Sequence, residues 1–318
     1  MSTRRPVVIS TPVTNTIKRV AVLVPCRDEE ATIADVVAGF TTSLPGCVVY
    51  VYDNGSSDAT GVRAVEAGAV VRTEDTPGKG GVVRRMFAEV DADVYVMADG
   101  DGTYDPAQAA VLVKRLLSDE LDMVVGTRAG VRVDAGRVGH AFGNRMFNLL
   151  YQALFATGFT DILSGYRAFS RRFVKSFPAV SSGFEIETEI SVHASQLRLP
   201  ATEVEVSYGT RSDGSASKLR TVADGTNILR AMLVLLKENR PLFFFGAIAG
   251  LFVTVALVLA VPLAVTFAQT GLVPRLPTAV LATGLALMGL LSATAGLVLD
   301  SVSKARLEAK RLAYLQNT

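Results

Sequence analysis

Two long apolar runs near the C-terminal end constrain the fold of this chain more than any other feature. Residues 242–267 and 276–299 contain no Asp, Glu, Lys or Arg. Each run exceeds the roughly 20 residues that a helix needs to cross a hydrocarbon core of about 30 Å. Together they raise the mean hydropathy of the chain to +0.35, which is high for a soluble protein. Two buried core helices are the alternative, but uncharged runs of this length, rich in Gly and Ala, favour a transmembrane hairpin.

The cations around these runs predict how the hairpin is oriented. The connecting loop carries only Arg275. The outer flanks carry Arg230, Lys237 and Arg240 before the first run, and Lys304, Arg306, Lys310 and Arg311 after the second. Because Lys and Arg are enriched in cytoplasmic flanks, we expect a multi-pass protein of the cytoplasmic (inner) membrane, with the main domain and both termini in the cytoplasm. Residues 1–17 lack a signal-peptide pattern and predict a flexible arm.

Between residues 19 and 128, β-branched runs alternate with stretches of helical apolar spacing. Strands are predicted at residues 19–25, 48–52, 70–72, 94–98 and 122–126, and helices at residues 29–40, 57–67, 80–90 and 106–117, the second helix capped by Ser56 or Ser57. This alternation predicts an α/β fold with a mostly parallel sheet and helices on both faces. We expect a main domain at residues 18–217, an amphipathic juxtamembrane region at 218–240, the hairpin at 241–300 and a cytoplasmic tail at 301–318.

Acidic side chains follow three of the predicted strands. Asp28 and Glu29 come after the first, Asp53 after the second, and Asp99 and Asp101 after the strand at residues 94–98. Ligands of parallel sheets bind beyond the carboxyl ends of the strands, so we expect these carboxylates to converge there. An isolated Asp-Gly-Asp-Gly is more often a turn, but this setting favours a Mg²⁺ or Mn²⁺ site for a diphosphate.

Other chemistries find little support in the residues. Cys26 and Cys47 lie in apolar, strand-like stretches of a domain assigned to a reducing compartment, which argues against a disulfide. His140 and His193 are far apart and lack the spacing of zinc ligands. The net charge of +2, without a basic block interleaved with aromatics, gives no sign of a nucleic-acid partner.

Eight ordered motifs resemble the family-2 glycosyltransferases of GT-A (Rossmann-like) fold. They are PCRDEEATI, YDNGSSDAT, TPGKGGVVRRMF, MADGDGTYDP, VVGTR, DILSGYRAFSR, GFEIETE and YGTRSDGSASKL. The best match is the branch of dolichol-phosphate mannose synthases and bacterial polyprenyl-phosphate glycosyltransferases, which also carries a two-helix anchor. The resemblance covers roughly residues 19–220.

The resemblance implies a site for a nucleotide sugar. Asp53 is expected to contact the nucleoside, with Pro25, Arg27 and Glu29 around the base pocket and Lys79 and Gly100 on the donor side. Asp101 matches the direct metal ligand of the family's DxD motif, and Asp99 the residue that contacts metal or ribose. Where some relatives have a Gln as a further metal ligand, this chain has Thr103, and Asn54 replaces an Asp of many relatives.

The resemblance also implies a site for an acceptor phosphate. Its expected ligands are Arg128, Arg145, Arg167, Arg211 and Lys218. Among them the motifs favour Arg128 and Arg211, with Arg128 also a catalytic residue; Arg211 and Lys218 are expected on a loop that closes over the site. Glu185 and Glu187 are interpreted as a solvated acidic face in preference to catalytic groups.

The implied reaction is inverting transfer of a sugar to a membrane polyprenyl phosphate of undecaprenyl, dolichyl or decaprenyl type, a step of cell-envelope glycan biosynthesis. UDP-glucose or UDP-N-acetylhexosamine is favoured over GDP-mannose as donor. A processive polysaccharide synthase would carry a QxxRW motif, yet the chain has no Trp. A sugar nucleotidyltransferase would have no membrane anchor, and a non-catalytic scaffold would not need the paired Asp. The sequence does not exclude a homo-oligomer.

Overall fold

The computed structural model describes residues 18–128, 159–180, 186–209, 233–234 and 236–317. Its centre is a seven-stranded sheet in the order β3-β2-β1-β4-β6-β5-β7. The strands are β1 Val20–Cys26, β2 Val48–Asp53, β3 Val70–Thr73, β4 Val94–Met97, β5 Met123–Arg128, β6 Arg167–Ser170 and β7 Ala201–Val206. All neighbouring pairs are parallel except those that β6 makes with β4 and β5. The mostly parallel α/β sheet predicted from the sequence is confirmed.

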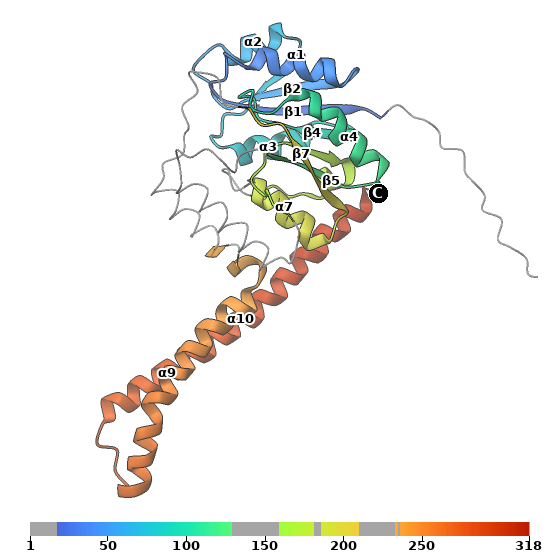
Figure 1. Ribbon diagram of the computed structural model, residues 1–318. Helices are drawn as coiled ribbons and strands as arrows, with labels where there is room; N and C mark the ends of the chain where they lie inside the picture. The colour runs from blue at the N-terminus through green and yellow to red at the C-terminus, as the bar shows by residue number, and fades with distance from the viewer. Residues whose placement is uncertain (1–17, 129–158, 181–185, 210–232, 235, 318) are drawn as a thin grey trace, which may run out of the picture.

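Helices cover both faces of the sheet (Figure 1). The domain contains α1 Ile33–Ser43, α2 Thr60–Glu66, α3 Lys79–Glu89, the 3₁₀ helix η1 Pro106–Gln108, α4 Ala109–Ser118, α6 Arg171–Ser176 and α7 Ile186–Leu197. Apolar residues of α3, α6 and α7 form one hydrophobic core with one face of the sheet, and those of α1 and α4 form a second core with the other face. Strands covered on both faces are apolar along their whole length, as the sequence of β1 is.

Helix α1 illustrates both the success and the limit of the sequence pattern. Its four buried residues recur at the spacing that one helix face requires. The predicted start at residue 29 is four residues early: the carbonyl oxygen of Glu29 accepts hydrogen bonds from the N–H groups of Thr32 (3.1 Å) and Ile33 (3.0 Å) in a turn that precedes the helix, which begins at Ile33. The predicted cap of α2 by Ser56 or Ser57 is also wrong: the helix begins at Thr60 after Ala59, and the two serine hydroxyls donate to Asp53 and Asp28.

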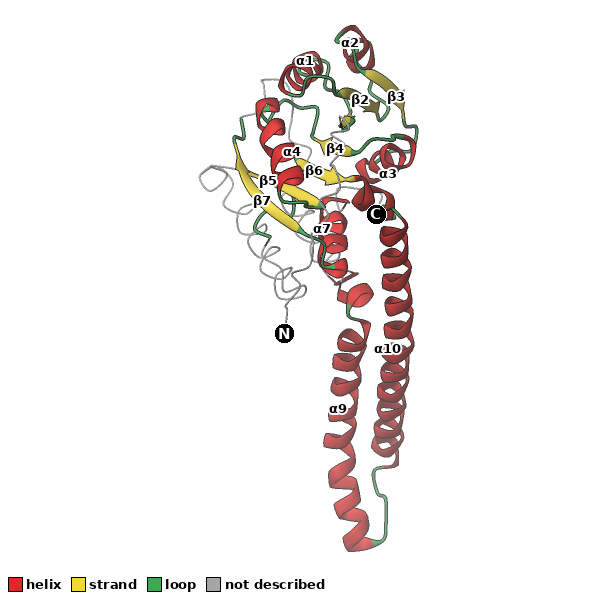
Figure 2. Ribbon diagram, turned by 90° about the vertical axis from the view of Figure 1, so that its right-hand side faces the viewer, coloured by secondary structure: helices red, strands yellow, loops and turns green. Residues whose placement is uncertain are grey.

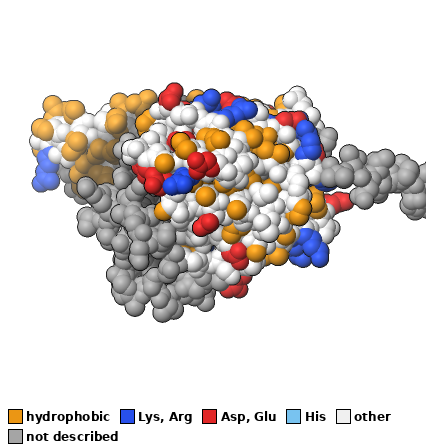
Figure 3. Space-filling model, turned by 90° about the horizontal axis from the view of Figure 1, so that it is seen from above, with side chains coloured by type: hydrophobic (Ala, Val, Ile, Leu, Met, Phe, Trp, Pro, Cys, Tyr) orange, Lys and Arg blue, Asp and Glu red, His pale blue; other side chains and the backbone are white. Residues whose placement is uncertain are grey.

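Two long helices project from the domain as a hairpin (Figure 2). They are α9 Pro241–Thr270 and α10 Leu276–Gln316. Their most apolar windows have mean hydropathies of 2.7 and 1.8, and only 11% and 17% of the residues in those windows are buried. At 1.5 Å per residue each helix is long enough to cross a bilayer. Viewed from above, hydrophobic side chains gather on the projecting hairpin, whereas acidic and basic side chains are interspersed over the domain (Figure 3).

Helix α10 does not end with its apolar run. Of the residues predicted as a cytoplasmic tail, 301–318, those up to Gln316 continue the same helix, which contacts α6 and α7 of the domain. Lys310 Nζ donates to Oε1 of Gln196 on α7 (3.3 Å), and Tyr314 near the end of the helix contacts Arg172 on α6. The division at residue 301 is therefore corrected, since a single helix joins the hairpin to the domain.

Candidate active site

The carboxyl ends of three parallel strands meet at one edge of the sheet. β1 has β2 on one side and β4 on the other, so the order of the strands reverses at β1. Ligands of such sheets bind at this switch point. Asp53 is the last residue of β2, and Asp99 and Asp101 follow the end of β4. The structure thus places the predicted acidic residues at the edge where a ligand is expected.

Gly100 brings the turn between Asp99 and Asp101 close to β1. A Cβ atom at residue 100 would overlap Sγ of Cys26, so a residue larger than Gly would require the Cys26 side chain to shift. The carbonyl oxygen of Gly100 accepts a hydrogen bond of 2.7 Å from the hydroxyl of Thr32. Packing and this hydrogen bond fix the turn that presents both carboxylates.

Asp101 is the more enclosed of the two carboxylates, with 4% of the residue exposed. Its Oδ1 accepts hydrogen bonds from the hydroxyl (2.6 Å) and the N–H (3.1 Å) of Thr103. Thr103 stands where some relatives were expected to have a further metal ligand. In this chain its hydroxyl orients Asp101, so the carboxylate is held in one position before any ligand arrives.

Lys79 joins two carboxylates from distant parts of the chain. Its Nζ forms an ion pair with Oδ1 of Asp99 and lies 2.6 Å from Oε1 of Glu187. Burial by itself lowers the pKa of Lys79, but attraction by Asp99 and Glu187 outweighs burial and raises that pKa above its ordinary value. Lys79 is therefore a fixed positive charge beside the carboxylate pair, and the solvated lysine that the sequence left open is excluded.

Glu187 was assigned from the sequence to a solvated acidic face, and this interpretation is wrong. The residue is 4% exposed and its carboxylate faces Lys79. No local pattern signals this contact, because it joins the first turn of α7 to the first residue of α3. In the sequence, burial of Glu187 is indicated only by the apolar residues near it in FEIET.

Asn54 anchors the segment that leads into Lys79. Its side-chain amide donates hydrogen bonds of 2.8 Å to the carbonyl oxygens of Glu74 and Thr76, and its Oδ1 accepts one of 2.8 Å from the N–H of Gly78. A carboxylate at this position would have no hydrogens for the two carbonyls. Asn in place of the usual Asp therefore has a structural reason in this chain.

The residues predicted to surround the nucleoside lie around the ends of β1 and β2. Asp53 Oδ1 accepts hydrogen bonds from the N–H (2.8 Å) and the hydroxyl (2.6 Å) of Ser56. Pro25 and Glu29 are half-buried, and Arg27 is exposed. The structure therefore brings these residues together at the ends of two neighbouring strands.

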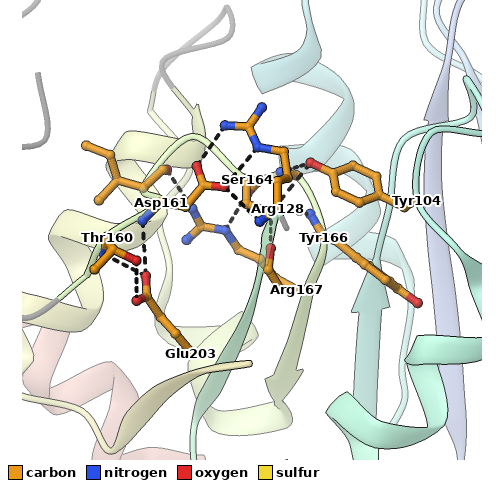
Figure 4. Close-up of polar contacts among 11 residues, drawn as sticks. Tyr104, Arg128, Thr160, Asp161, Ser164, Tyr166, Arg167 and Glu203 are labelled. Carbon is orange, nitrogen blue, oxygen red and sulfur yellow. Dashed lines mark hydrogen bonds and ion pairs between the residues drawn. The ribbon is translucent and has the colours of Figure 1, made fainter. Parts of the chain in front are cut away.

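Arg128, the last residue of β5, forms a bidentate ion pair with Asp161 (Figure 4). Its Nε donates to Oδ2 of Asp161 (2.8 Å) and its terminal nitrogen to Oδ1 (2.7 Å). Burial lowers the pKa of Arg128, but Asp161 outweighs it and raises the pKa. The guanidinium also lies 5.6 Å from the ring centre of Tyr208. The two bonds leave other N–H groups of the guanidinium for an anionic ligand.

Arg167 cannot be a ligand of the acceptor phosphate, so this prediction is wrong. The side chain is fully buried beneath the sheet edge. It donates to the carbonyl oxygens of Ile162 (2.6 Å) and Ser164 (2.8 Å) and to the hydroxyl of Ser191 (2.9 Å). These bonds fix the loop that carries Asp161 (Figure 4). The remaining predicted ligands Arg145, Arg211 and Lys218, and also Glu185, lie outside the described residues.

The donor atoms at the sheet edge suit a divalent cation that also binds a diphosphate. In the part of the chain that the structure describes, no group of three or more His, Cys, Asp and Glu side chains is arranged as a metal site. Mg²⁺ is commonly held by one or two carboxylates together with substrate phosphates and water. The pair Asp99 and Asp101 fits this kind of incomplete protein site.

Comparison with known proteins places the chain in a family. Residues 21–177 match the sequence model of glycosyl transferase family 2. The glycosyltransferase AglJ of Haloferax volcanii is 36% identical over 231 residues, which are 72% of this chain and 76% of AglJ. An uncharacterized protein of Shigella flexneri, SF2094/S2216, is 47% identical over 154 residues, 48% of this chain and 94% of that protein.

Solved structures agree with the fold. Glucosyl-3-phosphoglycerate synthase from Mycobacterium tuberculosis, in complex with Mn²⁺, UDP-glucose and phosphoglyceric acid, has a TM-score of 0.55 and 26% identity. The match covers 68% of this chain and 79% of that one. The sheet, its switch point and the paired Asp define a glycosyltransferase of GT-A fold, a class whose donors are nucleotide sugars. The chain belongs to glycosyltransferase family 2.

Proposed function

We propose that this glycosyltransferase transfers a sugar from a nucleotide diphosphate sugar to the phosphate of a membrane polyprenyl phosphate, giving a lipid-linked monosaccharide. The observation that carries this proposal is the continuity of α10, which runs from the apolar hairpin to its contact with the catalytic domain. A chain built in this way keeps its site at the surface where a polyprenyl phosphate presents its headgroup.

The proposed donor is a UDP-sugar such as UDP-glucose or UDP-N-acetylhexosamine. The mycobacterial synthase bound to UDP-glucose supports this choice. A GDP-mannose donor is the alternative. In either case Asp53, Pro25, Arg27 and Glu29 are proposed to bind the nucleoside, and Lys79 to lie beside the diphosphate.

The proposed cofactor is Mg²⁺ or Mn²⁺, held by Asp101 and Asp99. When bound, a divalent cation offsets the negative charge that develops on the leaving diphosphate. Thr103 and Gly100 fix the two carboxylates for this task, because they restrict the turn on both sides. The Mn²⁺ in the mycobacterial complex supports the assignment.

The chain needs no strong base for this reaction. A phosphate monoester has a second pKa near 6, so the acceptor is largely dianionic at neutral pH. One of its oxygens forms a bond to the anomeric carbon, while the bond from that carbon to the diphosphate oxygen breaks and the nucleoside diphosphate leaves with the electron pair. A single displacement inverts the anomeric configuration. Arg128 is proposed to orient the acceptor phosphate, together with Arg145, Arg211 and Lys218.

The proposed location is the cytoplasmic membrane, with the catalytic domain in the cytoplasm. Cations at Lys237, Arg240 and Lys304 near the domain end of the hairpin, against Arg275 alone in its connecting loop, support this orientation. The proposed functional units are the catalytic domain from residue 18 to about 217, the juxtamembrane region to residue 240 and the hairpin.

A second candidate is transfer to a soluble phosphorylated acceptor, favoured by the phosphoglyceric acid in the mycobacterial complex. One experiment separates the two. Membranes containing the full chain are incubated with Mn²⁺, labelled UDP- or GDP-sugars, and either a short-chain polyprenyl phosphate or 3-phosphoglycerate. We expect label in the organic extract with the lipid and a UDP-sugar. Label only in a water-soluble product would support the second candidate, and no lipid-linked product with any donor would refute the proposal.

A further inference from the structure

We propose that Glu187 is a positioning residue that holds the ammonium group of Lys79 and adds its own negative charge to the cluster around the metal-binding carboxylates; the inference rests on the proposed function. Lys79 Nζ lies 2.6 Å from Glu187 Oε1 and pairs with Asp99 on its other side. The exposed fractions of the Lys79 and Glu187 side chains are 10% and 6%. Water therefore screens neither charge well: Lys79 compensates the carboxylate of Glu187, and Asp99 and Glu187 together compensate Lys79.

The position of Lys79 is not explained by its own helix. It is the first residue of α3, where the helix dipole disfavours a positive charge. Asp99 alone would hold the ammonium, but Asp99 is also a proposed metal ligand. Glu187 supplies a second partner from α7, so Lys79 would keep a carboxylate partner if Asp99 were engaged with a metal ion.

The charges of this cluster match a divalent cation. The carboxylates of Asp99, Asp101 and Glu187 with the ammonium of Lys79 leave two net negative charges in an enclosed site. Removing the charge of Glu187 leaves one, and Lys79 then pairs with Asp99 alone and competes with the metal. A charge a few ångströms from a partly buried ligand site typically changes the binding constant of a charged ligand by about tenfold, the equivalent of one pK unit.

The test compares Glu187→Gln with Glu187→Asp in the full chain purified in detergent. Mn²⁺ binding is followed by electron paramagnetic resonance of the free ion, at saturating UDP. We expect Glu187→Gln to weaken Mn²⁺ binding about tenfold, and Glu187→Asp, which keeps the charge, to restore most of it. Glu189→Gln is the matched control, since Glu189 lies in the same turn of α7 and its Oε1 instead accepts a hydrogen bond from the N–H of Val180.

Transfer kinetics provide the second readout. Glu187→Gln is expected to raise the Mn²⁺ concentration for half-maximal turnover in parallel with the binding change, while the unfolding midpoint of the metal-free protein shows whether the variant is folded. Unchanged Mn²⁺ binding in folded Glu187→Gln, or no recovery in folded Glu187→Asp, would overturn the inference. Wild-type protein that binds Mn²⁺ but transfers no sugar would refute the proposed function, and the binding series would still decide the role of Glu187.

Discussion

The hydroxyl of Tyr314 donates a hydrogen bond of 2.9 Å to Oδ2 of Asp122, which joins the last turn of α10 to the start of β5. Asp122 is fully buried and also accepts hydrogen bonds from Ser170 Oγ (2.6 Å) and from Arg172. The helix that carries the second apolar run is therefore attached to the domain through a buried carboxylate. This contact restricts how the domain can turn relative to the hairpin.

Tyr314→Phe should lower the free energy of unfolding by about 1–2 kcal/mol, because Asp122 loses one of its donors and keeps the others. Thermal unfolding in detergent measures this change. Asp122→Asn and the double variant complete a mutant cycle, in which we expect clear non-additivity. Strictly additive effects would show that the hydrogen bond does not stabilise the docked helix.

Asp101→Asn should reduce sugar transfer by about 100-fold to 1,000-fold at saturating Mn²⁺, since several kcal/mol of charge stabilisation depend on the carboxylate. The amide still has an oxygen for the Thr103 hydroxyl, so the fold should persist. Initial rates and circular dichroism measure the two effects. Asp35→Asn, an exposed change on α1, serves as control. Turnover within a few-fold of wild type would rule out the metal role.

Gly100→Ala should destabilise the domain by about 1–3 kcal/mol, because the new Cβ overlaps Sγ of Cys26. Combining it with Cys26→Ala removes the sulfur, and the remaining neighbours, on Ile33 and Val24, are at 3.5 Å, an ordinary contact distance. We therefore expect the double variant to lose less stability than the two single changes added together. Chemical denaturation measures all three, and a double variant as unstable as that sum would contradict this packing.

His193 should make the domain less stable in acid. Ser176 gives its hydroxyl proton to the carbonyl of Phe173 (2.9 Å), so Nε2 of His193 donates to Ser176 Oγ (3.1 Å). Within the described residues, Nδ1 is left without a hydrogen-bond partner. Burial, and then the charge of Lys310, lower the pKa of His193 from its ordinary 6.5 to about 3.

The sign of the effect follows from this shift. Between pH 6.5 and 3 the unfolded chain binds a proton at His193 that the folded chain does not, so stability falls as the pH is lowered through this window. The loss should reach about 2 kcal/mol at pH 5. Unfolding midpoints of wild type and His193→Gln between pH 7 and 4.5 check it, since the Gln variant lacks the titrating ring. Parallel curves for the two proteins would refute the assignment.

Much of the fold follows from local sequence patterns. The β-branched runs and the helical spacing of Ile33, Val36, Val37 and Phe40 predicted the parallel strands and α1, because side-chain periodicity reflects backbone geometry directly. The uncharged runs likewise predicted α9 and α10. Helix starts were less accurate, since contacts with residues distant in the chain, such as the hydrogen bond from the Glu29 N–H to Thr60, shape the segments before the helices and leave no mark in residue spacing.

By itself, the sequence determined the α/β class, the apolar hairpin and the position of Asp53, Asp99 and Asp101 after strands, because each depends on residues close in the chain. Only the tertiary structure decided which charges are buried and with which partners. Arg167 lies among backbone carbonyls inside the domain, and Glu187 meets Lys79 across more than one hundred residues of chain. The physical reason is that the free energy of a charged side chain depends on the groups that surround it in space, and chain spacing does not specify those groups.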